Sequence, residues 1–300
     1  MSVRSPTVDA ATVRATLRSA GLRARHGLSQ NFLVDVDVLE AIVAEASPTV
    51  GRRMLEIGPG LGLLTGALLD GGASVTAIEL DRDLAALLRE RFADAIEAGR
   101  LALIEGDALD HDLTSQLEPP YDVVANLPYH ITSPILHALL GKAPRPARAV
   151  LMVQREVAER IAAPPGQMSY LSVFVQYHAR ARIVRRVPPD AFEPRPAVDS
   201  AILVLEPFTG DDSDLLPPAE ADDLWRLVQS GFRERRKMLH NVLTRQLPVD
   251  GARVDAALAA AGVAPDRRPQ TLAVGEWLAI REALGPLEPD GRGRRRGRGR

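Results

Sequence analysis

The chain has 300 residues, no cysteine and an apolar fraction of 46%, which suits one large or two modest globular domains and excludes disulfides and cysteine-based metal sites. No apolar run approaches the ~18 residues of a membrane span, and the N-terminus lacks the continuous apolar core of a secretory signal, so we expect a cytoplasmic protein without a membrane partner. The net charge of −2 hides an asymmetry: 37 basic residues less the six arginines of the last ten leave 31 against 39 acidic ones, a net of −8 for the body.

The first half of the chain predicts the opening unit of a nucleotide-binding α/β fold. Residues 1–28 are expected to be a lead-in with one short helix, and apolar spacing predicts a helix over 35–46. A strand over 53–57 then runs into the turn Gly58-Pro59-Gly60-Leu61-Gly62, which a helix follows. Glycine lets the backbone approach a ligand because it has no Cβ, so Gly58 and Gly60 are candidate cofactor-binding residues. The spacing is not that of a dinucleotide site, and no P-loop lysine follows.

Acidic residues stand where the next two predicted strands end. Glu79 follows the strand 74–78, and a carboxylate there can accept both ribose hydroxyls of an adenosine. The alternative is a carboxylate that caps the helix starting near Asp81. Asp107 follows the strand 101–105 and can accept from the adenine amino group of a cofactor; an ordinary turn aspartate is the alternative.

The fourth predicted strand, residues 121–125, runs into Asn126-Leu127-Pro128-Tyr129. The amide oxygen of Asn126 can accept from an amine, and Pro128 stiffens the loop and removes a backbone donor. We therefore expect nearby backbone carbonyls to face outward as further acceptors. Tyr129 offers a flat face on which a base can stack, with Phe192 expected on the other face. The pattern predicts a catalytic pocket that grips an exocyclic adenine amine; a capped turn is the alternative.

The remaining pattern predicts the rest of the sheet and a second domain. Helices are expected over 133–140 and 154–163, and strands over 148–153, 169–178 (with 183–187 as a continuation) and 198–206, giving a mostly parallel sheet with an antiparallel hairpin edge. Residues 207–218 have the composition of a linker. Four helical stretches follow within 219–285, and residues 286–300 are expected to be disordered.

A basic cluster, Arg233, Arg235, Arg236 and Lys237, is predicted to open a helix of the second domain. It is a candidate RNA-binding surface that contacts phosphate. A solvated helix face is the alternative.

The cofactor that fits these residues is a phosphate-free adenosyl compound, S-adenosyl-L-methionine. The glycine turn has the wrong spacing for a pyrophosphate, contains no Arg or Lys, and an amine-gripping loop has no role in hydride transfer. A Rossmann dehydrogenase is the alternative. Methyl transfer to an adenine amine needs orientation more than a strong base, and the target base must be unpaired or flipped out.

Taken together, these motifs resemble the small-subunit (16S) ribosomal RNA adenine N6,N6-dimethyltransferases, from about Arg25 to Ile280. The matching segments are SQNFLVD at 29–35, EIGPGLGLLT at 56–65, AIELD at 77–81, GDALD at 106–110, NLPYHITSPIL at 126–136, VQREVAERI at 153–161, LSVFVQ at 171–176, FEPRPAVDSA at 192–201 and FRERRKML at 232–239. The chain departs from the family at Ser29, where glycine is usual, in a short loop at 164–170, and in its Gly-Arg tail.

The resemblance implies a Rossmann-like S-adenosylmethionine-dependent methyltransferase sheet (29–207) with a small C-terminal helical domain (219–285). It implies cofactor contacts at Asn31, Leu33, Gly58, Glu79, Asp107 and Asn126, and no metal. The implied reaction adds four methyl groups to two adjacent adenosines in a hairpin loop near the 3′ end of the small-subunit RNA, within the assembling particle, by a monomeric enzyme. Alternatives are the large-subunit (23S) adenine methyltransferases of macrolide resistance and a mainly RNA-binding assembly checkpoint protein.

Overall fold

The computed structural model describes residues 9–25, 30–208 and 215–287. It divides into two compact units, one of Met1–Glu159 with His178–Gly210 and one of Arg160–Tyr177 with Asp211–Arg300. Residues 160–177, which fall inside the predicted domain 29–207, belong to the second unit rather than the first. From residue 288 on, the tail that was expected to be disordered lies outside the described residues, as does Ser29.

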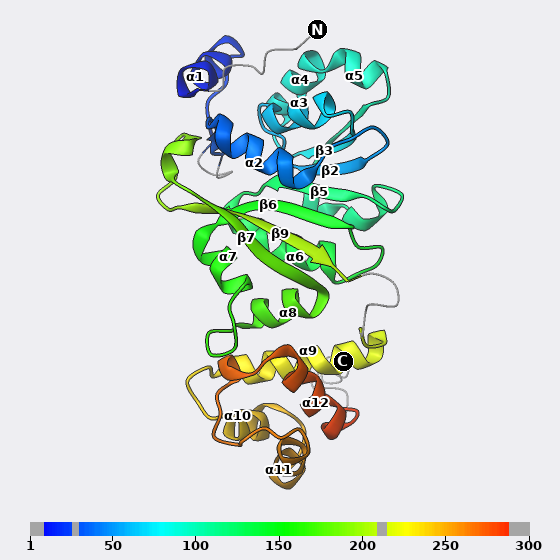
Figure 1. The fold of residues 1–300 in the computed structure, drawn as a ribbon, viewed down its shortest axis with the longest axis vertical. Coiled ribbons are helices and arrows are strands. Elements are labelled where there is room, and N and C mark those ends of the chain that lie inside the picture. Colours follow the sequence, from blue (N-terminus) through cyan, green and yellow to red (C-terminus); the bar gives the residue numbers. More distant parts are fainter. Residues whose placement is uncertain (1–8, 26–29, 209–214, 288–300) are drawn as a thin grey trace, which may run out of the picture. The chain divides into compact units, whose positions relative to one another are not determined.

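The first unit is built on a seven-stranded sheet with the order β4-β3-β2-β5-β6-β9-β7 (Figure 1). Its strands are β2 (Arg53–Ile57), β3 (Ser74–Glu79), β4 (Leu101–Glu105), β5 (Asp122–Asn126), β6 (Arg148–Gln154), β7 (Ala179–Val187) and β9 (Ser200–Pro207). The first five strands in that order are parallel to their neighbours, and β9 is antiparallel to both β6 and β7. The predicted parallel sheet with an antiparallel hairpin edge is therefore confirmed.

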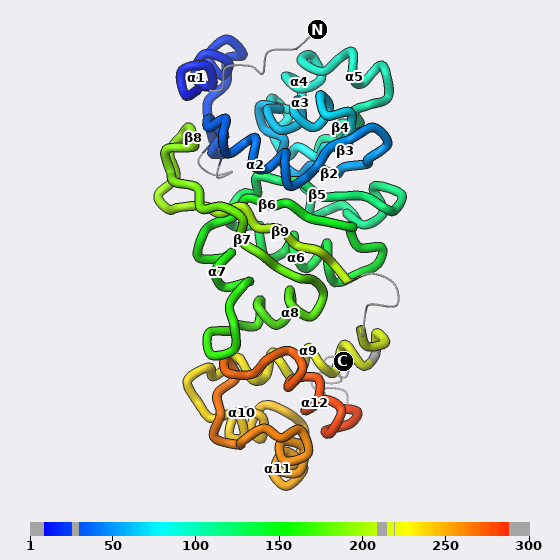
Figure 2. The backbone as a smooth tube through the Cα atoms, viewed as in Figure 1, coloured from blue at the N-terminus to red at the C-terminus, as the bar shows by residue number. Residues whose placement is uncertain are grey.

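Helices and two short strands complete the first unit (Figure 2). The helices are α1 (Ala10–Ser19), α2 (Val36–Ala46), α3 (Leu63–Asp70), α4 (Arg82–Arg91), α5 (Ala93–Glu97), α6 (Thr132–Leu140) and α7 (Arg155–Ile161). The strands β1 (Phe32–Leu33) and β8 (Phe192–Glu193) pair antiparallel as a separate two-stranded sheet. Asp35 and Asp81 cap α2 and α4 by accepting from backbone N–H groups of the first turn.

The strand order determines where a ligand can bind. From β2 the chain moves outward to β3 and β4, and then returns to β5 on the other side of β2. This reversal is the topological switch point of an α/β sheet, and ligands bind there, outside the carboxyl ends of the strands. Because Ile57 of β2 lies in register with both Ile78 of β3 and Ala125 of β5, the turns that follow these strands begin at one level.

The second unit is helical. Its helices are α8 (Tyr170–His178), α9 (Pro218–Arg233), α10 (Leu239–Gln246), α11 (Gly251–Ala260) and α12 (Val274–Leu284). They enclose a core that includes Trp277, which is fully buried. The loop before α8 donates from the backbone N–H groups of Gly166 and Met168 to the carbonyl of Gln270.

The strand predicted over 169–178 is wrong, because this segment is α8. Its Val, Phe and Tyr content favours strands, but tertiary packing outweighs that preference. Tyr170, Phe174 and Tyr177 recur at helical spacing, and all three rings contact Trp225 of α9 at centroid distances of 5.1 to 6.2 Å. The Ser169 hydroxyl also accepts from the backbone N–H of Ser172, as a capping side chain does.

Across the residues that the structure describes, we find no helix whose length and apolar character would allow it to cross a bilayer.

Candidate active site

A cavity of about 440 Å³ opens at the carboxyl ends of β2, β3, β4 and β5. This volume lies in the range of small-molecule sites. The predicted site residues that line it are Asn31, Leu33, Gly58, Gly60, Glu79, Asp107, Asn126, Leu127, Pro128 and Tyr129. The parallel strands bring Gly58 to Tyr129 together at one sheet edge, and the segment at β1 adds Asn31 and Leu33.

The glycine turn and Glu79 are held together by hydrogen bonds. Gly58 and Gly60 have φ of 70° and 59°, in the left-handed region that favours glycine. Glu79 Oε2 accepts from the backbone N–H of Gly60 at 2.9 Å, and Oε1 accepts from that of Asp81 at 2.9 Å. Burial raises the pKa of Glu79, although these N–H donors oppose the shift. The carboxylate therefore faces the cavity with both oxygens at fixed positions, and each oxygen has a further lone pair.

Asp107 follows β4 and caps the short turn after it. Its Oδ1 accepts from the backbone N–H of Leu109 at 2.9 Å. Asp107 therefore organises its turn, as the alternative expected, and it also lines the cavity. Contact between Asp107 and an adenine amino group stays a prediction.

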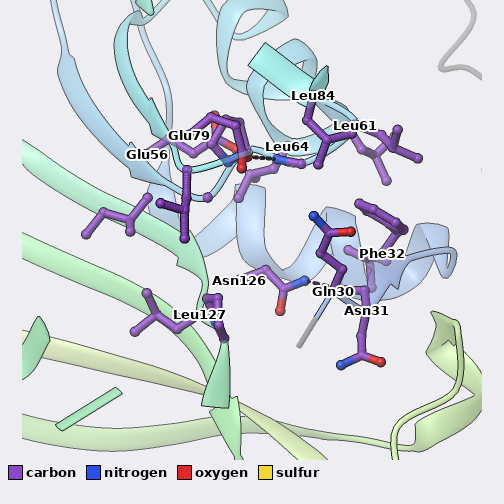
Figure 3. Close-up of a pocket in the computed structure, with 18 of the residues that line it drawn as sticks. Gln30, Asn31, Phe32, Glu56, Leu61, Leu64, Glu79, Leu84, Asn126 and Leu127 are labelled. Carbon is purple, nitrogen blue, oxygen red and sulfur yellow. Dashed lines mark hydrogen bonds between the residues drawn. The ribbon is translucent and has the colours of Figure 1, made fainter. Parts of the chain in front are cut away.

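Asn126 ends β5, and its amide orientation is set by the neighbouring segment (Figure 3). Its Nδ2 donates to the backbone carbonyl of Asn31 at 3.1 Å. Because this bond uses the nitrogen, it distinguishes the two ends of the amide, which are otherwise hard to tell apart. The Oδ1 atom is then the end that can accept from an amine in the cavity.

The three residues after Asn126 make a rigid loop. The N–H of Leu127 donates to Met152 of β6 at 3.1 Å. The carbonyl of Pro128 accepts from the backbone N–H of Ile131 at 3.2 Å; acceptance of an amine hydrogen by a nearby carbonyl stays a prediction. The Tyr129 hydroxyl forms a 2.8 Å hydrogen bond with Ser200 Oγ of β9, which fixes the ring. Burial raises the pKa of Tyr129, so the phenol is neutral at physiological pH.

Phe192 is not brought to the cavity. It lies in β8 opposite Leu33 of β1, its side chain is 3% exposed, and it packs in the main apolar core. In this arrangement its ring does not stack above the cavity opposite Tyr129, so that predicted role would require β8 to move.

The predicted RNA-binding cluster does not open a helix. Arg233 is the last residue of α9, and Arg235, Arg236 and Lys237 lie in the turn before α10. The helix dipole favours cations at this end, which explains the placement. Arg233 donates to Gln246 at 2.7 Å, whereas Arg235, Arg236 and Lys237 are exposed and form no ion pair with any residue that the structure describes.

Glu56 was not predicted as a site residue, yet it lines the cavity and is 1% exposed. Its pKa is raised to about 8, mainly by burial and in lesser part by the nearby Glu79, while the Thr65 hydroxyl, which donates to Glu56 Oε2 at 2.7 Å, opposes the shift. The available sequence signal is an acid inside an apolar strand directly before the glycine turn.

The cavity's charges fit a phosphate-free adenosyl cation. Glu79 and Asp107 place acidic side chains on its wall, and Glu56 adds a third carboxyl group, which its pKa of about 8 keeps protonated at neutral pH. Arg91 is the one Lys or Arg among the described lining residues, and its Nη1 donates to the Leu61 carbonyl at 2.6 Å, so it forms no phosphate cradle. No three acidic or histidine side chains of the described residues gather to hold a metal ion.

Comparison with known proteins decides the family. The model described as ribosomal RNA adenine dimethylase matches residues 21–285. The chain belongs to the ribosomal RNA adenine dimethylase family. Family membership establishes an enzyme that uses S-adenosyl-L-methionine as its methyl donor. The family's motifs therefore account for the cavity at the strand ends.

Several known proteins are similar over most of the chain. The ribosomal RNA small subunit methyltransferase A of Anaeromyxobacter sp. (strain K) is 44% identical over 91% of this chain and 97% of its own. The protein of that name from Synechococcus sp. (strain RCC307) is 43% identical, over 89% and 98%. Among solved structures, the 23S rRNA methyltransferase ErmE is 31% identical with a TM-score of 0.66, over 85% and 99%. A dimethyladenosine transferase from Plasmodium falciparum is 27% identical with a TM-score of 0.68, over 83% and 95%.

Proposed function

We propose that this adenine dimethylase acts on the small-subunit (16S) ribosomal RNA. It converts two adjacent adenosines of the 3′-terminal hairpin loop to N6,N6-dimethyladenosine, in the late assembling small subunit. Relatives at 40–44% identity that carry the small-subunit name support this substrate. We propose further that the enzyme works as a monomer in the cytoplasm, where that particle assembles.

The single observation that supports the chemistry is the amide of Asn126. Its nitrogen is engaged by the Asn31 carbonyl, so its oxygen can accept a hydrogen of the adenine N6 amine. Accepting that hydrogen draws the amine out of conjugation and directs its lone pair. S-adenosylmethionine, when bound, supplies an electrophilic methyl group. The methyl group would pass from the cofactor's sulfur to N6, and the proton that N6 then loses would go to water, so the residues of the site need not include a strong base.

Tyr129 and the loop that carries it provide the surface for the target base. The hydrogen bond to Ser200 holds the ring in one position, and a fixed aromatic face favours stacking of a base that has left its helix. Adenosines in a hairpin loop are already unpaired, which lowers the cost of reaching this pocket.

Mapping the methylated adenosines by mass spectrometry tests the substrate assignment. Unmodified small and large ribosomal subunits are offered together as competing substrates. We expect dimethylation of two adjacent adenosines in the small-subunit RNA. Methylation confined to the large-subunit RNA would overturn the assignment in favour of the second candidate, a 23S methyltransferase, which the similarity to ErmE over 99% of that chain favours.

Replacing Glu79 with alanine should weaken S-adenosylmethionine binding by about 100-fold, because two hydrogen bonds from ribose hydroxyls to a charged acceptor would be lost. Titration calorimetry measures the affinity. Glu105→Ala is the matched control: this residue lies opposite Glu79 in register on β4 but outside the cavity lining. Equal affinities of wild type and Glu79→Ala would contradict the ribose assignment.

Reversing the charge of Arg235 and Arg236 together should weaken RNA binding and flatten its salt dependence. Each lost phosphate contact lowers the slope of log affinity against log salt by roughly 0.7–0.9, so we expect a decrease of about 1.5. Fluorescence anisotropy over a salt series measures the slope. The control is charge reversal of the exposed Arg180 and Arg186 on β7, which changes the formal charge equally. If reversal at Arg235 and Arg236 leaves the salt slope unaltered, the cluster is a solvated turn and not an RNA-binding surface.

A further inference from the structure

Helix α1 lies outside the matched family region, residues 21–285, yet it reaches the cofactor cavity. Thr12, Val13 and Thr16 are among the residues that line it. The family's motifs give these residues no role, and the lead-in was not predicted to contribute to the site. One wall of the cavity therefore comes from residues outside the matched region.

The helix is held against the cavity by a small apolar cluster. Val13 and Leu17, one turn apart, are each 7% exposed, and they pack with Phe32, Leu61 and Leu84. Those three body residues line the cavity themselves. The opposite face of α1, with Ala11, Ala15 and Arg18, is exposed. A helix of ten residues is marginally stable alone, so α1 depends on this docking.

An ion pair joins α1 to β8 of the short sheet, and the two segments lie close together in the backbone view (Figure 2). Arg14 Nη1 lies 3.0 Å from Glu193 Oε2, and Glu193 lies opposite Phe32 in the β1–β8 pairing. A partly exposed ion pair contributes little to stability. It does, however, connect α1 to the strand that carries Phe192, which must move if Phe192 is to reach the target base. Docking of α1 and the position of β8 are therefore linked.

We propose that α1 is a removable wall of the cofactor site, whose docking slows the entry and release of the adenosyl ligand. The inference rests on the adenosyl site of the proposed function. Thr12 and Thr16 face the ligand, Val13 and Leu17 attach the helix, and Arg14 couples its position to β8. Release of the demethylated product, S-adenosylhomocysteine, then requires α1 to loosen, as a lid does.

The test measures dissociation of S-adenosylhomocysteine from the full chain by stopped-flow fluorescence. Val13→Asp places a charge in the docking cluster, and we expect release about tenfold faster or more. Ala15→Asp places the same charge on the exposed face of the same helix and should release the ligand at the wild-type rate. Equal release rates for Val13→Asp and wild type would overturn the proposal. A wild type that binds no S-adenosylhomocysteine would instead count against the adenosyl site itself.

Hydrogen exchange on the unaltered protein is a second test, and it does not depend on the correct folding of any variant. Saturating S-adenosylhomocysteine should slow exchange of the α1 amides together with those of residues 30–33 and 58–60. Protection limited to the latter two segments, with unchanged exchange in 10–19, would show that α1 does not respond to the ligand and would likewise overturn the proposal.

Discussion

Replacing Asn126 with alanine is expected to reduce methyl transfer by about 100-fold or more, the cost of removing one well-placed polar group from a reacting centre. The structure supplies the reason. The Asn31 carbonyl engages the amide nitrogen and leaves the oxygen to accept from the adenine amine. The affinity for S-adenosylmethionine should change by no more than about fivefold, because one hydrogen bond on the cofactor side is the most that is lost. Single-turnover assays with saturating cofactor and RNA separate the two effects.

Asn126→Asp distinguishes the two ends of the amide. It keeps an acceptor oxygen of the same shape but can no longer donate to Asn31. If acceptance from the amine is what matters, aspartate should restore part of the activity that alanine removes. If the alanine variant turns over as fast as wild type, Asn126 has no role in methyl transfer.

The parallel strands explain why much of the site could be predicted from sequence. Gly58, Glu79, Asp107 and Asn126 each directly follow a strand, or stand within two residues of its end. Parallel strands place such residues at one edge of the sheet whatever the exact register. Predicting four strands and their ends was therefore enough to assemble the cavity.

Residues whose position depends on packing between distant segments could not be predicted. Phe192 belongs to a motif, but pairing of β8 with β1 buries it in the core rather than at the cavity. The segment 169–178 has strand-forming residues, and its contacts with Trp225 make it a helix. The basic cluster at 233–237 lies at a helix end, where a boundary shift of a few residues changes a helix start into a turn.

The positions of helix α1 and Glu56 at the cavity could not be predicted from the sequence either. Nothing in residues 10–19 except their periodicity suggests a role, and only tertiary packing places Val13 against Leu61 and Leu84. Glu56 is the penultimate residue of β2, so it also stands near a strand end, but its place inside an apolar strand does not show that its side chain reaches the cavity. The Thr65 hydroxyl of α3 donates a hydrogen bond to the Glu56 carboxyl group. The apolar pattern of a strand does not predict this contact.

Replacing Glu56 with glutamine should stabilise the protein at neutral and alkaline pH. Burial raises the pKa of Glu56 from an ordinary 4.5 to about 8 in the fold. Between these values the folded state therefore binds one more proton than the unfolded state. The free energy of unfolding of the wild type then falls by about 1.4 kcal/mol per pH unit as pH rises. Glutamine has no proton to lose and keeps an oxygen that can accept from Thr65.

The quantity to measure is the difference in unfolding free energy between Glu56→Gln and wild type, by urea titration from pH 4 to 9. It should be near zero or slightly unfavourable below about pH 4.5, where the wild-type carboxyl is protonated in both states. It should then favour the variant increasingly, by on the order of 3 kcal/mol at pH 7, and level off above about pH 8. Glu40→Gln removes the same formal charge from an exposed position on α2 and supplies the reference. A difference in unfolding free energy that did not vary with pH would mean that Glu56 is ionised in the fold. A buried charge of that kind would require a nearby cation, which the described residues do not provide.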